Sequence, residues 1–140
     1  MLFHHVGLLT DRPELAASRL RGADYHAAEA VFDPLQGATV QLCHGPSGSP
    51  IIELVTPASS NAALGGLLRR RGDYMYHVCF EVPAIEAGLI ALRVDADDRI
   101  VEVASPRPAI LFNNRRVAFY STPGLGLVEL LESADPGAVG

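Results

Sequence analysis

The sequence predicts an α+β fold built from two copies of one strand–helix–strand–strand–strand (βαβββ) module. Short segments recur in the same order: "HHVGL" at residues 4–8 matches "YHVCF" at 76–80, and "IIELV" matches "LVELL". The spacing recurs as well, with 48 residues from His5 to Glu53 and 52 from His77 to Glu129. Because an internal repeat reports on the whole architecture, these matches outweigh any single-residue signal.

The composition is that of a globular protein, with 49% hydrophobic and 19% charged residues in a chain of 140. A formal net charge of −5 disfavours general nucleic-acid binding, which depends on neutralising phosphates. Cys43 and Cys79 stand in apolar runs and indicate small core or pocket residues rather than a disulfide. We find no signal-peptide pattern and no apolar run near 20 residues, so we expect a cytoplasmic protein without a membrane segment.

The first half begins with a strand, "LFHHVGLL", followed by a short helix in "TDRPELAASRLRG". Asp11 is expected to cap this helix, with Glu14 three residues on as in a capping box, and Gly22 to end it. Three strand-like pieces follow, at about 25–33, 38–44 and 50–57. "SSNAALGGLLRRR" then predicts a connecting helix, whose three arginines suit the negative end of the helix dipole.

The second half repeats the order with the strand "YMYHVCFEV" and a helix opened by Pro83. "RIVEVASP", "PAILF", "RRVAFY" and "LGLVELLE" are strand-like, with "NN" as a hairpin turn. The expected organisation is one domain with these parts: first module 1–57, linker helix 58–73, second module 74–133 and flexible tail 134–140.

Four polar residues stand in otherwise apolar strands. Because strand side chains alternate between faces, Val78 and Phe80 point to one side of the second module and His77 to the other. The four residues that each share a face with mostly apolar neighbours are His5, Glu53, His77 and Glu129. A buried carboxylate is costly unless it is paired, protonated or bound to a cation.

Two imidazoles and two carboxylates that converge would suit a first-row divalent metal ion. Taken singly, each histidine could be a hydrogen-bonded core residue, and each glutamate could face solvent at a sheet edge. The repeat favours the metal interpretation because it places all four together. Three other histidines break the repeat and are expected to be surface or structural residues: His4, His26 and His44.

The segments "HHVGLLT", "IIELVTP", "YHVCFEV" and "VAFYSTPGLGLVELLE" resemble the landmarks of the vicinal oxygen chelate superfamily, which includes glyoxalases, bleomycin-resistance proteins and methylmalonyl-CoA epimerases. The resemblance spans residues 3–132. It implies a curved mixed sheet around a metal cavity. It further implies one divalent ion per subunit (Co, Ni, Mn, Zn or Fe), held by His5, Glu53, His77 and Glu129.

The resemblance also implies a metal-dependent lyase or isomerase that stabilises an enolate of a small carbonyl or acyl-thioester substrate. Glu129 is the first candidate for moving the proton and Glu53 the second. Two departures bear on epimerase chemistry. Tyr76 replaces the first of two histidines in the fifth strand, and Leu35 or Gln36 stands where a second carboxylate is expected, with Asp33 out of register.

Four residues are further candidates for substrate contact: Arg115, Arg116, Gln36 and Cys79. The two arginines could hold a carboxylate or phosphate by charge-assisted hydrogen bonds, or they could belong to a solvated hairpin. A non-catalytic drug- or metabolite-binding protein and a ring-cleaving dioxygenase are the alternative functions. Exposed sheet edges predict a homodimer.

Overall fold

The computed structural model describes residues 1–139, and the chain divides into two compact units. One unit comprises residues 5–76, and the other joins residues 1–4 to the residues from His77 onward. Residues 5–76 contain most of a first strand, a helix, four further strands and a second helix, and the residues from His77 onward contain most of a strand, a helix and three further strands. No helix in the described part of the chain is long and apolar enough to cross a membrane.

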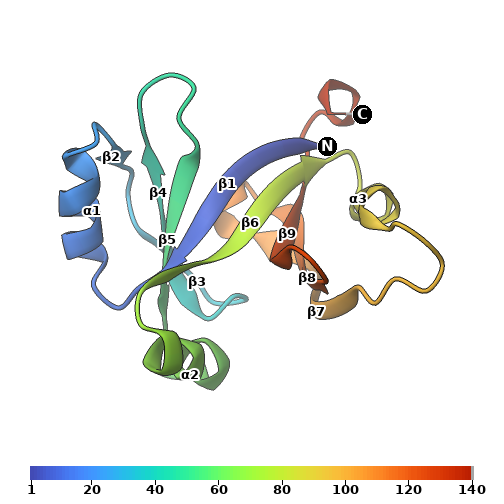
Figure 1. Cartoon of the computed structure of the whole chain (residues 1–140). Coiled ribbons are helices and arrows are strands. Elements are labelled where there is room, and N and C mark those ends of the chain that lie inside the picture. The colour runs from blue at the N-terminus through green and yellow to red at the C-terminus, as the bar shows by residue number, and fades with distance from the viewer. Residues whose placement is uncertain (140) are drawn as a thin grey trace. The chain divides into compact units, whose positions relative to one another are not determined.

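The first module contains a sheet in the order β2-β4-β5-β1, with β3 also paired to β4. Only β1 and β5 run parallel, and the other pairs are antiparallel. The strands are β1 (Leu2–Leu9), β2 (His26–Ala27), β3 (Val31–Asp33), β4 (Ala38–His44) and β5 (Ile51–Pro57). The helices are α1 (Pro13–Arg21) and α2 (Ala62–Arg71) (Figure 1).

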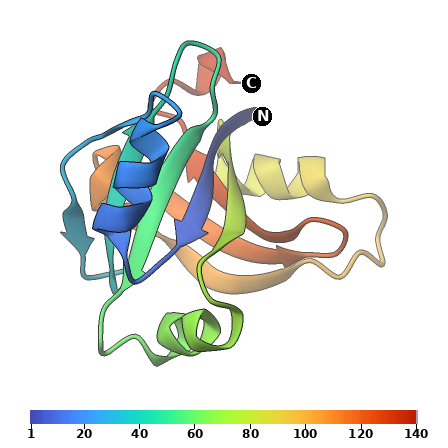
Figure 2. The same cartoon turned by 60° about the vertical axis from the view of Figure 1, so that its left-hand side comes forward.

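Helix α1 packs on one face of this sheet, in front of β4 and β5 in Figure 2. Its buried Ala17 lies in a core cluster with Tyr25, Cys43, Ile52 and Leu54. Strand alternation therefore sends Glu53, the neighbour of Ile52 and Leu54, to the opposite face.

The second module has the strand order β6-β9-β8-β7, with β6 and β9 parallel. Its elements are β6 (Tyr74–Val82), α3 (Ile85–Leu92), β7 (Val101–Ala109), β8 (Arg115–Thr122) and β9 (Gly126–Glu132), with 3₁₀ turns at Ile110–Phe112 and Pro136–Ala138. Helix α3 packs on β9, and Gly88 makes the close approach possible. A methyl group on Gly88 would lie 2.8 Å from Cγ1 of Val82 and 3.0 Å from Cδ1 of Leu130.

Several local predictions were wrong. The piece at 25–33 forms two short strands, β2 and β3. "PAILF" is not a separate strand: β7 runs through Ala109, and Ile110–Phe112 form a 3₁₀ turn.

The predicted asparagine turn is present, with Asn113 and Asn114 both at positive φ (55° and 62°). In the expected flexible tail, Val139 is buried, and Gly140 lies outside the described residues.

The predicted capping box is also absent. Helix α1 begins at Pro13 without a side-chain cap, and α3 begins at Ile85, two residues after Pro83. The backbone N–H of Arg12 donates instead to Oγ1 of Thr10 (3.0 Å), and Thr10 donates to Oδ1 of Asp73 (2.9 Å). Thr10 therefore fixes the entry to α1 through a contact distant in sequence.

Candidate metal centre

The first buried His–Glu pair, a candidate half-site for a metal ion, joins His5 on β1 to Glu53 on β5. Their parallel register places Gly7 opposite Glu53, and His5 two residues earlier shares the face of Gly7. The Nε2 atom of His5 lies 3.5 Å from Oε1 of Glu53. Both side chains are buried, with 0% and 2% of their surface exposed. Because residue 7 is glycine, β1 itself has no side chain at the position opposite Glu53.

The second half-site repeats this arrangement on β6 and β9. Cys79 stands opposite Glu129, and His77 comes two residues before Cys79. The Nε2 atom of His77 lies 3.4 Å from Oε1 of Glu129, again with both side chains buried. The ring of Phe119 meets that of His77 edge to face, with centroids 5.3 Å apart. This packing holds the imidazole in a defined orientation.

The two separations, 3.5 and 3.4 Å, exceed the usual 2.7–3.2 Å of a hydrogen bond to nitrogen. They are compatible with a nitrogen and an oxygen that each contact one cation at about 2.0–2.2 Å. All four side chains offer a buried ligand atom: His5, Glu53, His77 and Glu129. Each half-site thus supplies one imidazole nitrogen and one carboxylate oxygen, a donor set that suits a borderline transition ion.

Burial gives this donor set an energetic reason to bind a cation. A carboxylate removed from water costs several kcal/mol unless hydrogen bonds or opposite charge compensate it. A neutral imidazole compensates only by hydrogen bonding, whereas a divalent cation compensates by charge as well. The buried His–Glu pairs are therefore consistent with metal ligands.

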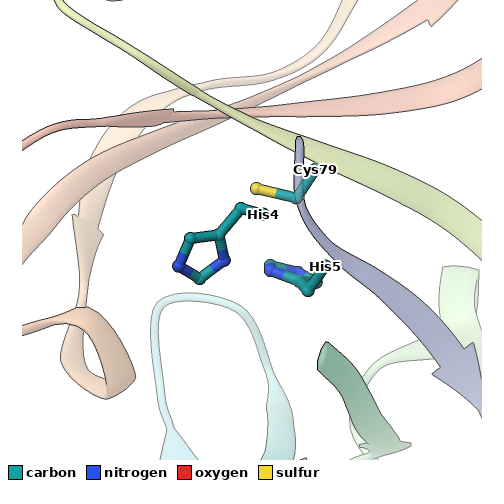
Figure 3. A group of neighbouring side chains, drawn as sticks. All are labelled: His4, His5 and Cys79. Carbon is teal, nitrogen blue, oxygen red and sulfur yellow. The ribbon is translucent and has the colours of Figure 1, made fainter. Parts of the chain in front are cut away.

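His4 and Cys79 form a smaller group within the unit that joins residues 1–4 to the residues from His77 onward (Figure 3). Their potential ligand atoms lie within 4.8 Å of each other, and the ring of His4 also meets that of Phe112 edge to face at 5.4 Å. His4, which the sequence predicted to be a surface or structural residue, is half-buried and makes this ring contact. Cys79 is fully buried and faces the same side as His77, in keeping with a pocket residue.

Asp33 is the acidic residue nearest in sequence to positions 35 and 36, where a second catalytic base was expected. It forms hydrogen bonds within a local turn. Its carboxylate accepts hydrogen bonds from the backbone N–H groups of Leu35 and Gln36 and from the side-chain amide of Gln36. Asn61 donates to the carbonyl oxygens of Gln36 and Gly37. Leu35 itself is 54% exposed. The structure therefore gives Asp33 and Gln36 structural partners.

Both candidate arginines on β8 form ion pairs inside the second module. Arg115 donates to Oε2 of Glu81 at 2.5 Å and to the carbonyl of Phe112. Arg116 donates two hydrogen bonds to the carboxylate of Glu132, at 2.7 and 2.8 Å, and this pairing lowers the pKa of Glu132. A substrate role for either arginine remains a prediction.

Two features escaped sequence reasoning. One is the Thr10–Asp73–Arg12 network, in which Arg12 also pairs with Asp73 and lowers its pKa. The other is a cavity of about 420 Å³ on the α1 face of the first module, lined by residues that include Ser18, Thr39 and Thr56. Because Leu54 also lines it, this cavity lies on the face opposite Glu53. It is therefore separate from the His5–Glu53 pair.

Comparison with known proteins places the chain in a family. A profile of the Glyoxalase/Bleomycin resistance protein/Dioxygenase superfamily matches residues 4–119. The chain belongs to this superfamily. The resemblance stated from the four sequence segments is thereby confirmed. No curated protein sequence matches the chain.

Solved structures confirm the fold of this superfamily member. Methylmalonyl-CoA epimerase from Mycobacterium tuberculosis is 22% identical, with 97% of this chain and 90% of that one covered and a TM-score of 0.77. A Streptomyces coelicolor methylmalonyl-CoA epimerase variant in complex with 2-nitronate-propionyl-CoA is 21% identical, with 96% and 99% covered and a TM-score of 0.73. A hypothetical protein from Bacillus halodurans is 18% identical, with 95% and 94% covered and a TM-score of 0.73.

Proposed function

We propose that the two half-sites converge on one divalent metal ion and that the protein is a metal-dependent isomerase or lyase. Its substrate is an acyl thioester of coenzyme A, and the reaction moves a proton at the carbon next to the thioester carbonyl. Superfamily membership and the epimerase fold of the structural neighbours support this proposal. The proposal takes its substrate class from the neighbour that binds an acyl-CoA analogue.

One observation carries the proposal: each module holds one buried His–Glu pair, with the histidine on its first strand and the glutamate on its last. The pairs have nearly equal N···O separations, 3.5 and 3.4 Å. A purely structural role for one buried pair would not require its repetition in a duplicated module. Two copies of the same pair suit two halves of one ligand set.

The roles of the four residues follow from their chemistry. His5 and His77 would bind the ion through Nε2 as neutral imidazoles, and Glu53 through a carboxylate oxygen. Glu129 would bind it as well and accept the substrate proton, because a carboxylate can exchange between the two tasks. When bound, the ion supplies Lewis-acid stabilisation of the negative charge that develops on the thioester oxygen.

The turn at Asp33 affects the type of proton transfer that we propose. Epimerisation with two bases requires a proton acceptor on each face of the carbon. Leu35 and Gln36 have no acidic group, and the Asp33 carboxylate accepts three hydrogen bonds from its own turn. These contacts favour proton transfer on one face by Glu129 over a mechanism with two bases.

We further propose that the protein is a homodimer. Strand β7 is the edge strand of the sheet in the second module. It pairs with β8 and carries the exposed side chains of Val101 and Val103. Exposed apolar edges are commonly covered by a second copy. Light scattering at tens of micromolar should give the mass of a dimer, and a monomer would contradict this part of the proposal.

The experiment that tests the function is solvent exchange in deuterium oxide. The metal-loaded protein is incubated with propionyl-CoA and methylmalonyl-CoA, and deuterium at the carbon beside the carbonyl is measured by mass spectrometry. We expect exchange that depends on metal and on protein. Tight binding of either thioester without exchange would instead identify a binding protein of the bleomycin-resistance type.

A further inference from the structure

The C-terminal turn of α2 carries three consecutive arginines: Arg69, Arg70 and Arg71. All three are exposed, and among the described residues no acidic group pairs with any of them. Arg12, Arg115 and Arg116, by contrast, each pair with a carboxylate. The chain is acidic overall, with a net charge of −5, so this cluster is a local patch of positive charge on a negatively charged protein.

Two of these guanidinium groups converge on one point of the helix. A methyl group placed on Gly66 would lie 3.2 Å from Nη1 of Arg70 and 3.8 Å from Nη2 of Arg69. The two cationic groups therefore lie no more than about 7 Å apart, a distance at which like charges repel in the absence of an anion. Both side chains fold back along the helix over the glycine rather than extending past its last carbonyl groups.

The glycines of α2 add a second observation. Gly65 and Gly66 stand in the middle of a ten-residue helix, where glycine is less favourable than alanine. A methyl group on Gly65 would meet Nη1 of Arg69 at 3.5 Å and no other atom within contact range. The absence of side chains here therefore makes room for the arginines. The third arginine, Arg71, is held separately over the ring of Tyr74 at 5.5 Å.

A chain of hydrogen bonds within the first module relates this cluster to Glu53. Asp73 follows Arg71 by two residues and accepts from Thr10 at 2.9 Å. The backbone N–H of Thr10 donates to the carbonyl of Val55 at 3.0 Å, two residues along β5 from Glu53. With about 3.3 Å per extended residue, the length of these links sets an upper limit on the order of 25–30 Å for the separation between the cluster and Glu53. The long pantetheine arm of coenzyme A can span such a distance.

We propose that Arg69, Arg70 and Arg71 bind the phosphate groups of a coenzyme A thioester whose acyl end occupies the His–Glu site. This inference rests on the proposed function. Coenzyme A carries a diphosphate and a 3′-phosphate, which together offer several oxygens to neighbouring guanidinium groups. Arginine matches phosphate oxygens with two parallel hydrogen bonds, and a multiply charged anion relieves the repulsion between Arg69 and Arg70.

The test compares two substrates that share the reacting group. Propionyl-CoA carries the phosphates, whereas the propionyl thioester of pantetheine lacks all of them. The triple variant Arg69→Gln/Arg70→Gln/Arg71→Gln should raise KM for propionyl-CoA in the deuterium-exchange assay by about tenfold or more, with kcat unchanged. KM for the pantetheine thioester should stay at the wild-type value.

A matched control removes the same charge from other exposed positions: Arg19→Gln/Arg93→Gln/Arg99→Gln. This control should leave KM for propionyl-CoA within about twofold of wild type, because long-range charge effects are screened by salt. The triple lysine variant at 69–71 keeps the positive charge but loses the planar guanidinium groups. Its KM for propionyl-CoA should therefore lie between the values of the wild-type protein and the 69–71 triple glutamine variant. An equal rise in KM for both substrates, or no rise for propionyl-CoA, would overturn the proposal.

Equilibrium binding keeps this test independent of turnover. Adenosine 3′,5′-bisphosphate serves as the probe in titration calorimetry against the wild-type protein and the two triple glutamine variants. We expect measurable binding that the 69–71 variant loses and the control retains. Equal binding to all three proteins would refute the arginine site, whether or not any thioester undergoes exchange. If instead only the 69–71 variant loses binding but no thioester undergoes exchange, the result would count against the proposed reaction alone.

Discussion

The two modules keep the same His–Glu pair but surround it differently. Glu53 is flanked in the sheet by Gly7 on β1 and Leu42 on β4, whereas Glu129 is flanked by Cys79 on β6 and Phe119 on β8. Phe119 also packs edge to face on His77. The two modules thus share the chemical pair but not the residues beside it, so each pair can be tested against a different local environment.

The two modules also differ on the helix-covered faces of their sheets, which lie opposite the His–Glu pairs. In the second module, α3 lies tightly on Val82 and Leu130, and Arg116 pairs with Glu132 at its end. In the first module, the α1 face keeps a cavity of about 420 Å³. The packing of α3 therefore makes the second module the more sensitive of the two to added volume.

The largest effect should separate the two glutamates. If Glu129 moves the proton, Glu129→Gln should lower the exchange rate by about 10²–10⁴, since an amide cannot accept a proton as a carboxylate does. Glu53→Gln should lower it less, because three of the four proposed ligands remain. The measurement is deuterium entry into propionyl-CoA with each variant at equal metal loading. A greater loss for Glu53→Gln would reverse the two roles.

A smaller effect should distinguish the helices of the two modules. Gly88→Ala forces a methyl group to 2.8 Å from buried Val82, so we expect a loss of about 1–3 kcal/mol in the free energy of unfolding. Gly65→Ala in α2 meets only the end of a flexible arginine and should gain up to about 1 kcal/mol. Urea denaturation measures both. Equal effects of the two substitutions would refute the packing difference.

The smallest effect concerns acid stability of the second module. The ion pair with Arg116 lowers the pKa of Glu132 in the folded state below its ordinary value of 4.5. Its stabilisation is therefore present above pH 4.5 and is lost as the pH falls through the lowered value. Glu132→Gln should reduce stability at pH 7 and flatten its decline below pH 4.5. Thermal denaturation from pH 7 to pH 3 would detect this, and parallel curves for the two proteins would contradict it.

The sequence predicted the two βαβββ modules because strand alternation is a local pattern and because the same order of elements recurs in both halves of the chain. It also predicted burial for the four His and Glu side chains, because each one stands among mostly apolar residues of a strand, and all four are buried in the structure. The ion pairs of Arg115 with Glu81 and Arg116 with Glu132 could not be predicted in this way. They depend on the register between strands, which the hydrophobic pattern does not give at single-residue precision.

Local sequence rules failed where a distant contact replaced them. Asp11 satisfies the capping pattern, but Thr10 forms the hydrogen bond to Arg12 because Asp73 holds its hydroxyl from 63 residues away. Likewise, "RIVEVASP" and "PAILF" were expected to be separate strands, whereas β7 continues to Ala109 with two irregularities in its pairing to β8.

Metal content measured together with the two histidine substitutions tests the central claim most directly. Elemental analysis of the purified protein should find about one divalent ion per subunit. His5→Ala and His77→Ala change different modules, yet each variant should lose most of that metal if, as proposed, both modules contribute ligands to one ion. Unchanged metal content in the double variant His5→Ala/His77→Ala would contradict the shared metal centre.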